Sequence, residues 1–463
     1  MTRLQVWLDQ DPIGWLSHDP KTNRFAFDYN EQWLAAPRSY PLSPRLPLQP
    51  DPARTADSHS ADVRQFFENL LPEGEALDHA AQAYGISKSN TVGLINALGR
   101  ETAGAIRVTG DRDAAAAADH ADHHDPSRNL GDDADDGRDA GLRLITPTML
   151  SDRIRDRARM PFSVWDGKVR LSIAGYQDKI AVYERDGRWF MVNGNRSNLA
   201  STVIVKPVPV RPQLRSLPDN EFMCMQLAQR VGLAVARARL FRVPEPVLLV
   251  HRFDRIEKGD RVHRLHLIDG CQALGLAVGM KYERPYGDGR DVRDIRDGVT
   301  YAKLFRLLDQ SPRPARDKQA LLRWVIFQIL IGNTDAHGKN VSFFYDIQGL
   351  ELAPAYDLVC RPAIDDAQLA ETFAMAIGDA FVEPEISPFE WAAFARECGL
   401  PIMMVSQQLR RLAIRVLDSL PGVVADVTDA SVSAEVANTI AGIVDRNCRR
   451  QIEMAPDILK VRT

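Results

Sequence analysis

The stretch Ile331-Gly332-Asn333-Thr334-Asp335-Ala336-His337-Gly338-Lys339-Asn340 decides the fold of this chain. It follows an apolar run, Leu321 to Ile331, that reads LLRWVIFQILI and predicts a helix or strand deep in the core. Gly332 and Asn333 are residues that end such an element. Polar side chains that follow directly on a buried element are held rigidly, as a functional site requires.

Two aspartates and one asparagine in and after this stretch have a spacing that is typical of a catalytic site. Asp335 and Asn340 lie five positions apart, and Asp357 follows in Ala355-Tyr356-Asp357. Protein kinases use such an Asp to accept the proton of the attacking hydroxyl, such an Asn to bind Mg²⁺, and a later Asp to hold Mg²⁺ against the phosphates of ATP. The alternative is a polar turn that only ends a helix, and the spacing alone does not decide between the two.

Two residues upstream favour the kinase interpretation. Val203 to Lys206 is a β-branched strand ending in Lys, which buried strands avoid unless the Lys is paired. Kinases place their phosphate-contacting Lys on such a strand. Glu221 opens a predicted helix running to about Val231 and is the expected partner of Lys206. The helix dipole alone is the competing explanation for an acid at this position.

Two further segments fit the same order. Val169 to Ser172 and Lys179 to Tyr183 are predicted strands around a small-residue tip that contains Gly175. This is the shape of a flap that covers nucleotide phosphates, although an ordinary hairpin explains a single Gly equally well. The strand that begins at Leu248 leads into a polar turn at Arg255, where the chain of a two-lobed kinase crosses between lobes and its backbone binds adenine.

Size and composition predict a cytoplasmic globular protein. The 463 residues suffice for two or three domains with their own cores. No apolar run approaches the roughly 20 residues that span a membrane, and the N-terminus lacks the apolar region of a secretory signal. Five scattered cysteines without a C-x-x-C pair argue against disulfides and zinc. A formal charge of −4 does not predict a nucleic-acid binder.

The charge is concentrated in one segment. Residues 111–139 hold ten Asp and three Arg, a local −7 that leaves +3 for the rest of the chain. With almost nothing apolar to bury, residues 109–142 are predicted to be an acidic low-complexity insert. Its Asp119 to Asp125, which reads DHADHHD, could bind a metal ion weakly, but a solvated linker is favoured because metal ligands need a scaffold.

We predict an α+β, two-lobed protein-kinase-like fold. Residues 1–108 form a small N-terminal domain, residues 143–256 a β-rich ATP-binding part, and residues 257–463 an all-helical C-terminal lobe with the catalytic loop. Strands are expected in the first domain at 4–7, 12–16 and 25–29, and helices at 60–71, 74–83 and 87–98. Helices of the C-terminal lobe are expected at 301–310, 315–331, 388–398, 402–419 and 432–450.

The last two helices carry arginines, at Arg410-Arg411, Arg415 and Arg449-Arg450. A solvated helix surface is preferred here over contact with nucleic acid or an acidic partner.

Over nearly its whole length the chain resembles the HipA family of toxin kinases from bacterial type II toxin–antitoxin modules. The resemblance rests on Ser172–Lys179, Asp219–Glu221, Arg252–Arg255, Cys271–Gly275 with Lys281–Glu283, Gly332–Asn340, Pro354–Asp357 and, in the N-terminal domain, Phe66–Gly74. The acidic insert departs from the family. It lies outside these motifs, so it places the partner surface in doubt rather than the chemistry.

The resemblance implies a role for each motif residue. Asp335 would be the catalytic base, and Asn340 and Asp357 would hold Mg²⁺. ATP would be bound by the phosphate-loop residues Ser172, Ile173, Ala174 and Gly175, by Lys206 with its partner Glu221, by the adenine hinge His251, Arg252, Phe253 and Asp254, and by His337 and Lys339 beside the base. Lys339 would offset charge on the transferring phosphoryl group, and His337 is expected to be structural.

The resemblance also implies regulation and partners. Ser172 occupies the position that the family autophosphorylates, and a phosphoserine adds about −1.5 to −2 charges where the phosphates of ATP must sit. The implied substrate is a serine of a host protein, with aminoacyl-tRNA synthetases as the substrate class, and the outcome is arrested translation and dormancy. The implied partner is a HipB-like helix-turn-helix antitoxin that binds operator DNA, so that this chain contacts DNA mainly indirectly.

Two alternatives stay open. The same fold could phosphorylate a small-molecule hydroxyl, which an ATPase assay with candidate metabolites would detect. A catalytically silent co-repressor would bind the antitoxin without binding nucleotide. The clustered Asp335, Asn340 and Asp357 argue against the silent form, because a scaffold has no need of them.

Overall fold

The structure, a computed structural model, describes residues 1–110, 142–165, 168–169, 177–192, 198–366 and 370–462. The chain consists of two compact units. The first unit comprises Met1–Pro41, Leu46–Val205 and His251–His266, and the second comprises Leu42–Arg45, Lys206–Val250 and Leu267–Thr463. Most of the acidic insert lies outside the described residues, as do the phosphate-loop residues Ser172, Ile173, Ala174 and Gly175.

The first unit begins with an antiparallel sheet that confirms the predicted strands of the N-terminal domain. Its strand order is β3-β2-β1-β4, from β1 (Thr2–Leu8), β2 (Asp11–Asp19), β3 (Arg24–Tyr29) and β4 (Ile106–Gly110). Four helices accompany it: α1 (Glu31–Ala35), α2 (Ala56–Glu68), α3 (Gly74–Tyr84) and α4 (Thr91–Leu98). Alternate residues of β1, Leu4, Val6 and Leu8, are buried, as the period of a strand with one covered face requires.

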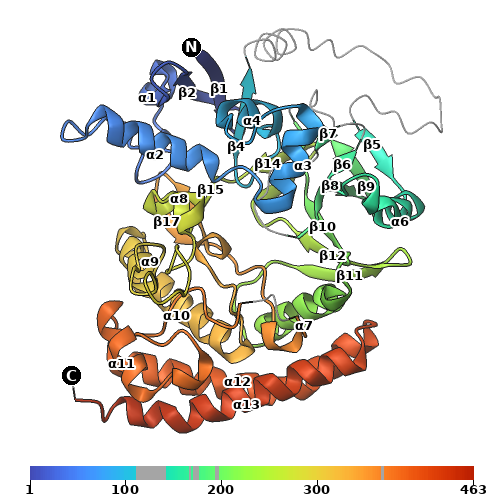
Figure 1. The fold of residues 1–463 in the computed structure, drawn as a ribbon, viewed down its shortest axis with the longest axis vertical. Helices are drawn as coiled ribbons and strands as arrows, with labels where there is room; N and C mark the ends of the chain where they lie inside the picture. Colours follow the sequence, from blue (N-terminus) through green and yellow to red (C-terminus); the bar gives the residue numbers. More distant parts are fainter. Residues whose placement is uncertain (111–141, 166–167, 170–176, 193–197, 367–369, 463) are drawn as a thin grey trace. The chain divides into compact units, whose positions relative to one another are not determined.

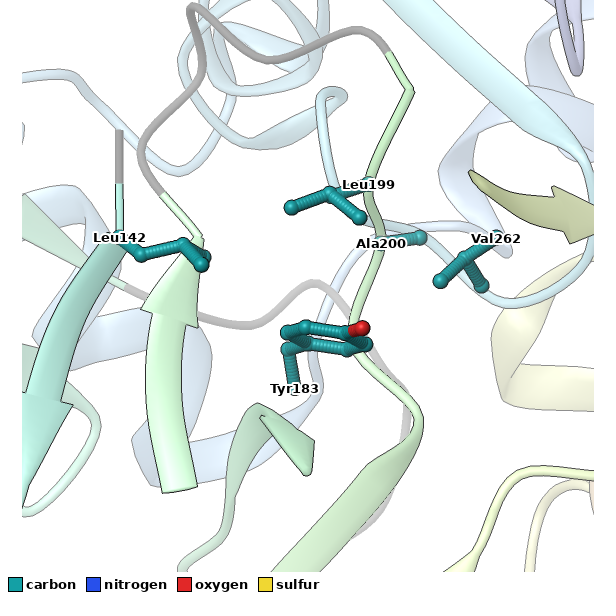
Figure 2. Close-up of a cluster of buried hydrophobic side chains, with 5 residues drawn as sticks. All are labelled: Leu142, Tyr183, Leu199, Ala200 and Val262. Atoms are coloured by element: carbon teal, nitrogen blue, oxygen red, sulfur yellow. The ribbon is translucent and has the colours of Figure 1, made fainter. Parts of the chain in front are cut away.

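A second sheet follows in the same unit. Four strands of this six-stranded sheet lie in the order β10-β8-β9-β5, with β5 (Leu142–Ile145), β8 (Ile180–Arg185), β9 (Arg188–Val192) and β10 (Val203–Pro207). Strand β10 belongs to the first unit as far as Val205. Smaller elements of the unit are α6 (Pro147–Arg155), β6 (Val164–Trp165), β7 (Lys168–Val169), β13 (Arg255–Lys258) and β14 (Arg261–Arg264). A buried apolar cluster consists of Leu142, Tyr183, Leu199, Ala200 and Val262 (Figure 2). Phe190 and Val192 pack against it.

The second unit confirms the predicted helices. They are α7 (Leu217–Arg230), α9 (Tyr301–Leu307), α10 (Pro314–Ile331), α11 (Pro388–Glu397), α12 (Ile402–Asp429) and α13 (Ala434–Ile458). The short helix α8 (Gly270–Leu274) was not predicted. Figure 1 shows α12 and α13 lying along each other. No helix among the described residues is long and apolar enough to cross a membrane.

Helix α12 runs ten residues beyond its predicted end at residue 419 and contains Pro421. Proline removes one backbone hydrogen bond and normally ends a helix. Here the buried face continues past it through Leu420, Val423 and Val427. Packing of that face therefore outweighs the local preference of Pro421.

The C-terminal part also contains strands, so its predicted all-helical character is corrected. β15 (Leu267–Asp269), β16 (Ser342–Asp346) and β17 (Gly349–Leu352) form an antiparallel sheet in that order. Ile268, Phe343 and Leu350 are among its buried residues, and Gly349 turns the chain at a φ of 114°. These strands are too short for their alternation to predict them against a helical background.

The remaining elements are short. A hairpin of β11 (Ala238–Arg242) and β12 (Pro246–His251) precedes the turn at 252–254. Single 3₁₀ turns occur at η1 (Asp156–Ala158), η2 (Pro212–Leu214), η3 (Val278–Met280), η4 (Leu308–Gln310), η5 (Gly338–Asn340), η6 (Arg361–Ala363) and η7 (Glu383–Glu385).

Candidate active site

Helix α10 delivers the predicted catalytic loop from the core of the second unit. It ends at Gly332, whose φ of 67° is the left-handed conformation that glycine adopts without strain. Asn333 stabilises the turn with two hydrogen bonds. Its Nδ2 donates to Gln328 Oε1 at 2.9 Å, and its Oδ1 accepts from the amide of Asp335 at 3.2 Å. Asp335 is therefore fixed by the end of a buried helix, as the sequence predicted.

The carboxylate of Asp335 is partly exposed and has a donor on each oxygen. Its side chain is 34% exposed. Oδ1 accepts from the hydroxyl of Tyr282 at 2.9 Å, and Oδ2 accepts from Arg361 Nη2 at 3.0 Å. Burial raises the pKa of Asp335 above its usual value, and the charge of Asp357 adds to this, while Arg361 and Tyr282 act against it. Such an acid suits a general base that must be ionised and still basic.

Asn340 and Asp357 offer oxygen ligands that suit Mg²⁺. Asn340 Nδ2 donates to the carbonyl of Asp335 at 2.8 Å, so the opposite end of the amide is the oxygen that can bind a metal. Asp357 has a φ of 57°, a conformation that is costly for a residue other than glycine and is often kept at functional sites. One carboxylate and one amide fit Mg²⁺, which is usually held by few protein ligands together with water and phosphate oxygens.

Lys206 lies at the centre of an acidic pair. Its Nζ donates to Glu221 Oε1 and Oε2 at 2.7 and 2.9 Å, and to Asp357 Oδ1 at 2.9 Å. The Lys206 side chain is 9% exposed and that of Glu221 only 1%, whereas Asp357 is 37% exposed. Burial opposes the charge of Lys206, but Asp357 and Glu221 outweigh it and raise its pKa above the usual value. The predicted pairing of Lys206 with Glu221 is confirmed.

Lys339 forms an ion pair with Asp269, and its role toward the phosphoryl group stays a prediction. Its Nζ donates to Asp269 Oδ2 at 2.7 Å, and its side chain is 2% exposed. Asp269 in turn caps helix α8 by accepting from the amide of Gln272 at 2.8 Å. The Lys339 carbonyl accepts from the hydroxyl of Tyr356 at 2.6 Å. The positive charge of Lys339 therefore serves to anchor the loop.

His337 is buried, and its ring meets that of Tyr282 edge-on, with centroids 5.1 Å apart. This placement agrees with the structural role expected for it.

The predicted adenine hinge, residues 251–254, belongs to the first unit. The amide of Arg252 donates to the carbonyl of Thr202 at 2.8 Å, and the carbonyl of Asp254 accepts from the amide of Leu265 at 3.0 Å. These two backbone groups are therefore already used. The assignment of residues 251–254 as the adenine hinge stays a prediction.

The side chains of Arg252 and Asp254 belong to a buried ion-pair network of the first unit. Glu101 accepts from Arg252, Arg255 and Arg264 at 3.0–3.2 Å. Burial opposes the charge of Glu101, yet the three arginines hold its pKa at about 2. Asp254 accepts from Arg252 and Arg255, and also from the amide of Gly104 at 2.7 Å. This network ties residues 101–104 to the turn at 252–255.

The second unit thus brings together five of the predicted residues: Lys206, Glu221, Asp335, Asn340 and Asp357. Sequence reasoning assigned no role to Tyr282 and Arg361, which hold the base, and assigned Asn333 only the role of ending the buried element. Tyr282 stands in one of the quoted family motifs, and Arg361 follows Asp357 by four positions. Neither spacing carries a known signature that would have revealed the contact.

Two family models match the chain. The HipA N-terminal domain matches residues 4–109, and the HipA-like C-terminal domain matches residues 171–422. The serine/threonine-protein kinase toxin HipA of Shewanella oneidensis is 37% identical over 424 residues, 91% of this chain and 89% of that protein. The putative kinase Y4mE of Sinorhizobium fredii is 32% identical, over 95% of this chain and 96% of that protein.

A solved structure agrees with these matches. It is the complex of Shewanella oneidensis HipA and HipB with operator DNA. The match has a TM-score of 0.81 and 34% sequence identity, and it covers 99% of this chain and all of the matched chain.

Proposed function

The chain belongs to the HipA family and is a homologue of the serine/threonine-protein kinase toxin HipA; on this premise we propose that it transfers the γ-phosphoryl group of ATP to a serine of a host protein. The observation that carries the proposal is the assembly of Lys206, Glu221, Asp335, Asn340 and Asp357 within one compact unit. A cation, a base and oxygen ligands for a metal are the parts that phosphoryl transfer requires.

Each of these residues has a defined task in the transfer. The carboxylate of Asp335 accepts the proton of the seryl hydroxyl as its oxygen attacks the γ-phosphorus and the bond to the departing ADP oxygen breaks. Lys206, held by Glu221, stabilises negative charge on the phosphates. Asn340 and Asp357 would hold Mg²⁺, which neutralises phosphate oxygens when it is bound.

The partners and the outcome follow from the same premise. We propose that the chain acts in the cytoplasm as the toxin of a type II toxin–antitoxin module. Its substrate would be an aminoacyl-tRNA synthetase, whose phosphorylation arrests translation and leads to dormancy. A HipB-like helix-turn-helix antitoxin would neutralise it and provide most of the contact with operator DNA. The solved complex of the Shewanella oneidensis relative, which contains HipB and operator DNA, supports this part of the proposal.

The kinase function is tested by incubating the purified chain with ATP labelled in its γ-phosphate and with casein as a generic serine acceptor. We expect Mg²⁺-dependent label on serine and an equal amount of ADP, both lost when EDTA removes the metal. ADP formation stimulated by a metabolite, without label on protein, would instead identify a small-molecule kinase. Unchanged ATP with no detectable nucleotide binding would identify a silent co-repressor.

Autophosphorylation at Ser172 gives a separate prediction. A phosphate there would compete with the phosphates of ATP, so phosphorylated chain is expected to lose activity. After incubation with Mg·ATP, intact-protein mass spectrometry should show the wild type heavier by one phosphoryl group and Ser172→Ala unshifted. Equal phosphorylation of the two proteins would place the modification elsewhere and remove this switch from the proposal.

A further inference from the structure

Asp335 is oriented by two side chains that lie outside the catalytic loop. The hydroxyl of Tyr282 donates to Oδ1 at 2.9 Å, and Arg361 Nη2 donates to Oδ2 at 3.0 Å. The two donors come from chain segments 53 and 26 residues away from the base. An exposed Asp side chain turns freely, whereas a carboxylate with a donor on each oxygen has a fixed plane.

Tyr282 is itself held firmly by its neighbours in the chain. The Lys281 carbonyl accepts from the amide of Gly338, inside the catalytic loop, at 2.9 Å. On the other side, Glu283 is buried, pairs with Arg296, and accepts from the amide of Ala376 at 2.8 Å. The segment that carries Tyr282 is therefore hydrogen-bonded to the catalytic loop that contains Asp335.

Arg361 is tied to the helix that carries Glu221. The side chain of Asn220, fully buried in α7, bonds both backbone groups of Cys360: its Oδ1 accepts from the amide and its Nδ2 donates to the carbonyl, each at 2.8 Å. Arg361 follows directly. The residue next to Asn220 is Glu221, which holds Lys206. Helix α7 thus contacts Lys206 through Glu221, and through Asn220 it contacts the residue that precedes Arg361.

We propose that Tyr282 and Arg361 form a carboxylate clamp, a pair of positioning residues that aim Asp335 at the acceptor hydroxyl and make its orientation depend on the docking of α7. The inference rests on the proposed kinase function and names residues that serve it. A carboxylate has about four lone-pair sites, so two donors leave room for the hydroxyl that reacts. The clamp therefore orients the base without blocking it.

The clamp predicts losses in turnover rather than in nucleotide affinity. A base misplaced by about 1 Å costs up to roughly 100-fold in rate. We expect Tyr282→Phe and Arg361→Gln each to lower kcat about 10-fold or more by this mechanism, with KM and Kd for Mg·ATP within about twofold of the wild type. Arg361→Lys, which keeps a charged donor, should recover part of the rate.

The double variant sharpens the test, because both donors act on one carboxylate. Combining Tyr282→Phe with Arg361→Gln should cost less than the product of the two single losses, as is found for residues that act as a unit. Label transfer to casein gives kcat and KM, a fluorescent ATP analogue gives Kd, and thermal unfolding reports the fold. Tyr286→Phe and Arg290→Gln are matched controls, since both residues are exposed in the segment that follows Tyr282.

Several results would overturn the clamp. The first is an unchanged kcat in both single variants. The second is weaker binding of Mg·ATP by Arg361→Gln, which would make Arg361 a phosphate ligand. The third is a loss of rate that is matched by a loss of thermal stability. An inactive wild type would instead refute the proposed kinase function, and the clamp with it. An active wild type with unaffected clamp variants would refute the clamp alone.

Discussion

Replacing Asp335 by Asn is expected to abolish growth arrest when the chain is produced in a bacterial host. The amide keeps the shape of the side chain, and its oxygen can still accept from Tyr282, but its NH₂ group cannot accept from Arg361. The amide also cannot take the proton of the attacking hydroxyl. General bases contribute about 10²- to 10⁴-fold to rate, which is ample to remove toxicity. Because the side chain is one-third exposed, the free energy of unfolding should change by less than about 1 kcal/mol.

Growth after induction and thermal unfolding of the purified variants provide the measurements. Asp418→Asn is the matched control, because it makes the same chemical change at an exposed position of α12. It should arrest growth as the wild type does. If Asp335→Asn remained equally toxic, Asp335 would not be the base and the kinase account of toxicity would fail.

Replacing Lys206 by Met is expected to cost both activity and stability. The change leaves Glu221 buried at 1% exposure without its cation. Breaking a buried ion pair in this way typically costs about 3–5 kcal/mol. The phosphates of ATP lose their cation at the same time, so transfer should fall below detection. Urea unfolding and label transfer to casein measure the two effects.

A double variant separates the two effects. Adding Glu221→Met to Lys206→Met removes the uncompensated charge, and apolar replacements of a buried pair are often neutral in stability. We therefore expect most of the stability to return while transfer stays absent. Lys318→Met, which breaks a surface pair with Asp309, should cost less than about 1 kcal/mol. A single variant as stable as the wild type, or a double variant that transfers phosphate, would contradict this account.

The sequence could predict those parts of the site whose signal is local. The buried run before Gly332 identifies the helix end that carries Asp335, and Lys at the end of a β-branched strand requires a partner such as Glu221. The first signal is the apolar pattern of one segment, and the second is the free-energy cost of burying a charge in one strand. Each can be recognised without knowing which distant segments are in contact. For the same reason strands β1 to β3 and helices α9, α10 and α11 were predicted nearly to their ends.

The missing parts depend on contacts between distant segments. Nothing in the surroundings of Tyr282 or Arg361 indicates that both meet one carboxylate, and Asn220 reads as an ordinary helix residue until Cys360 is placed beside it. The ion pair of Lys339 with Asp269 is likewise absent from the sequence prediction, because the two residues are 70 positions apart. The extension of α12 through Pro421 depends on tertiary packing, which local preference does not report.

The central claim is that Asp335, in the unit that also holds Lys206 and Asp357, is the base of a phosphoryl transfer. The most direct test is the single-turnover rate of γ-phosphoryl transfer from bound Mg·ATP to protein serine, measured at equal nucleotide occupancy. The account predicts rapid transfer for the wild type and Asp418→Asn, and a rate about 10²- to 10⁴-fold lower for Asp335→Asn. Equal rates for Asp335→Asn and the wild type would contradict it.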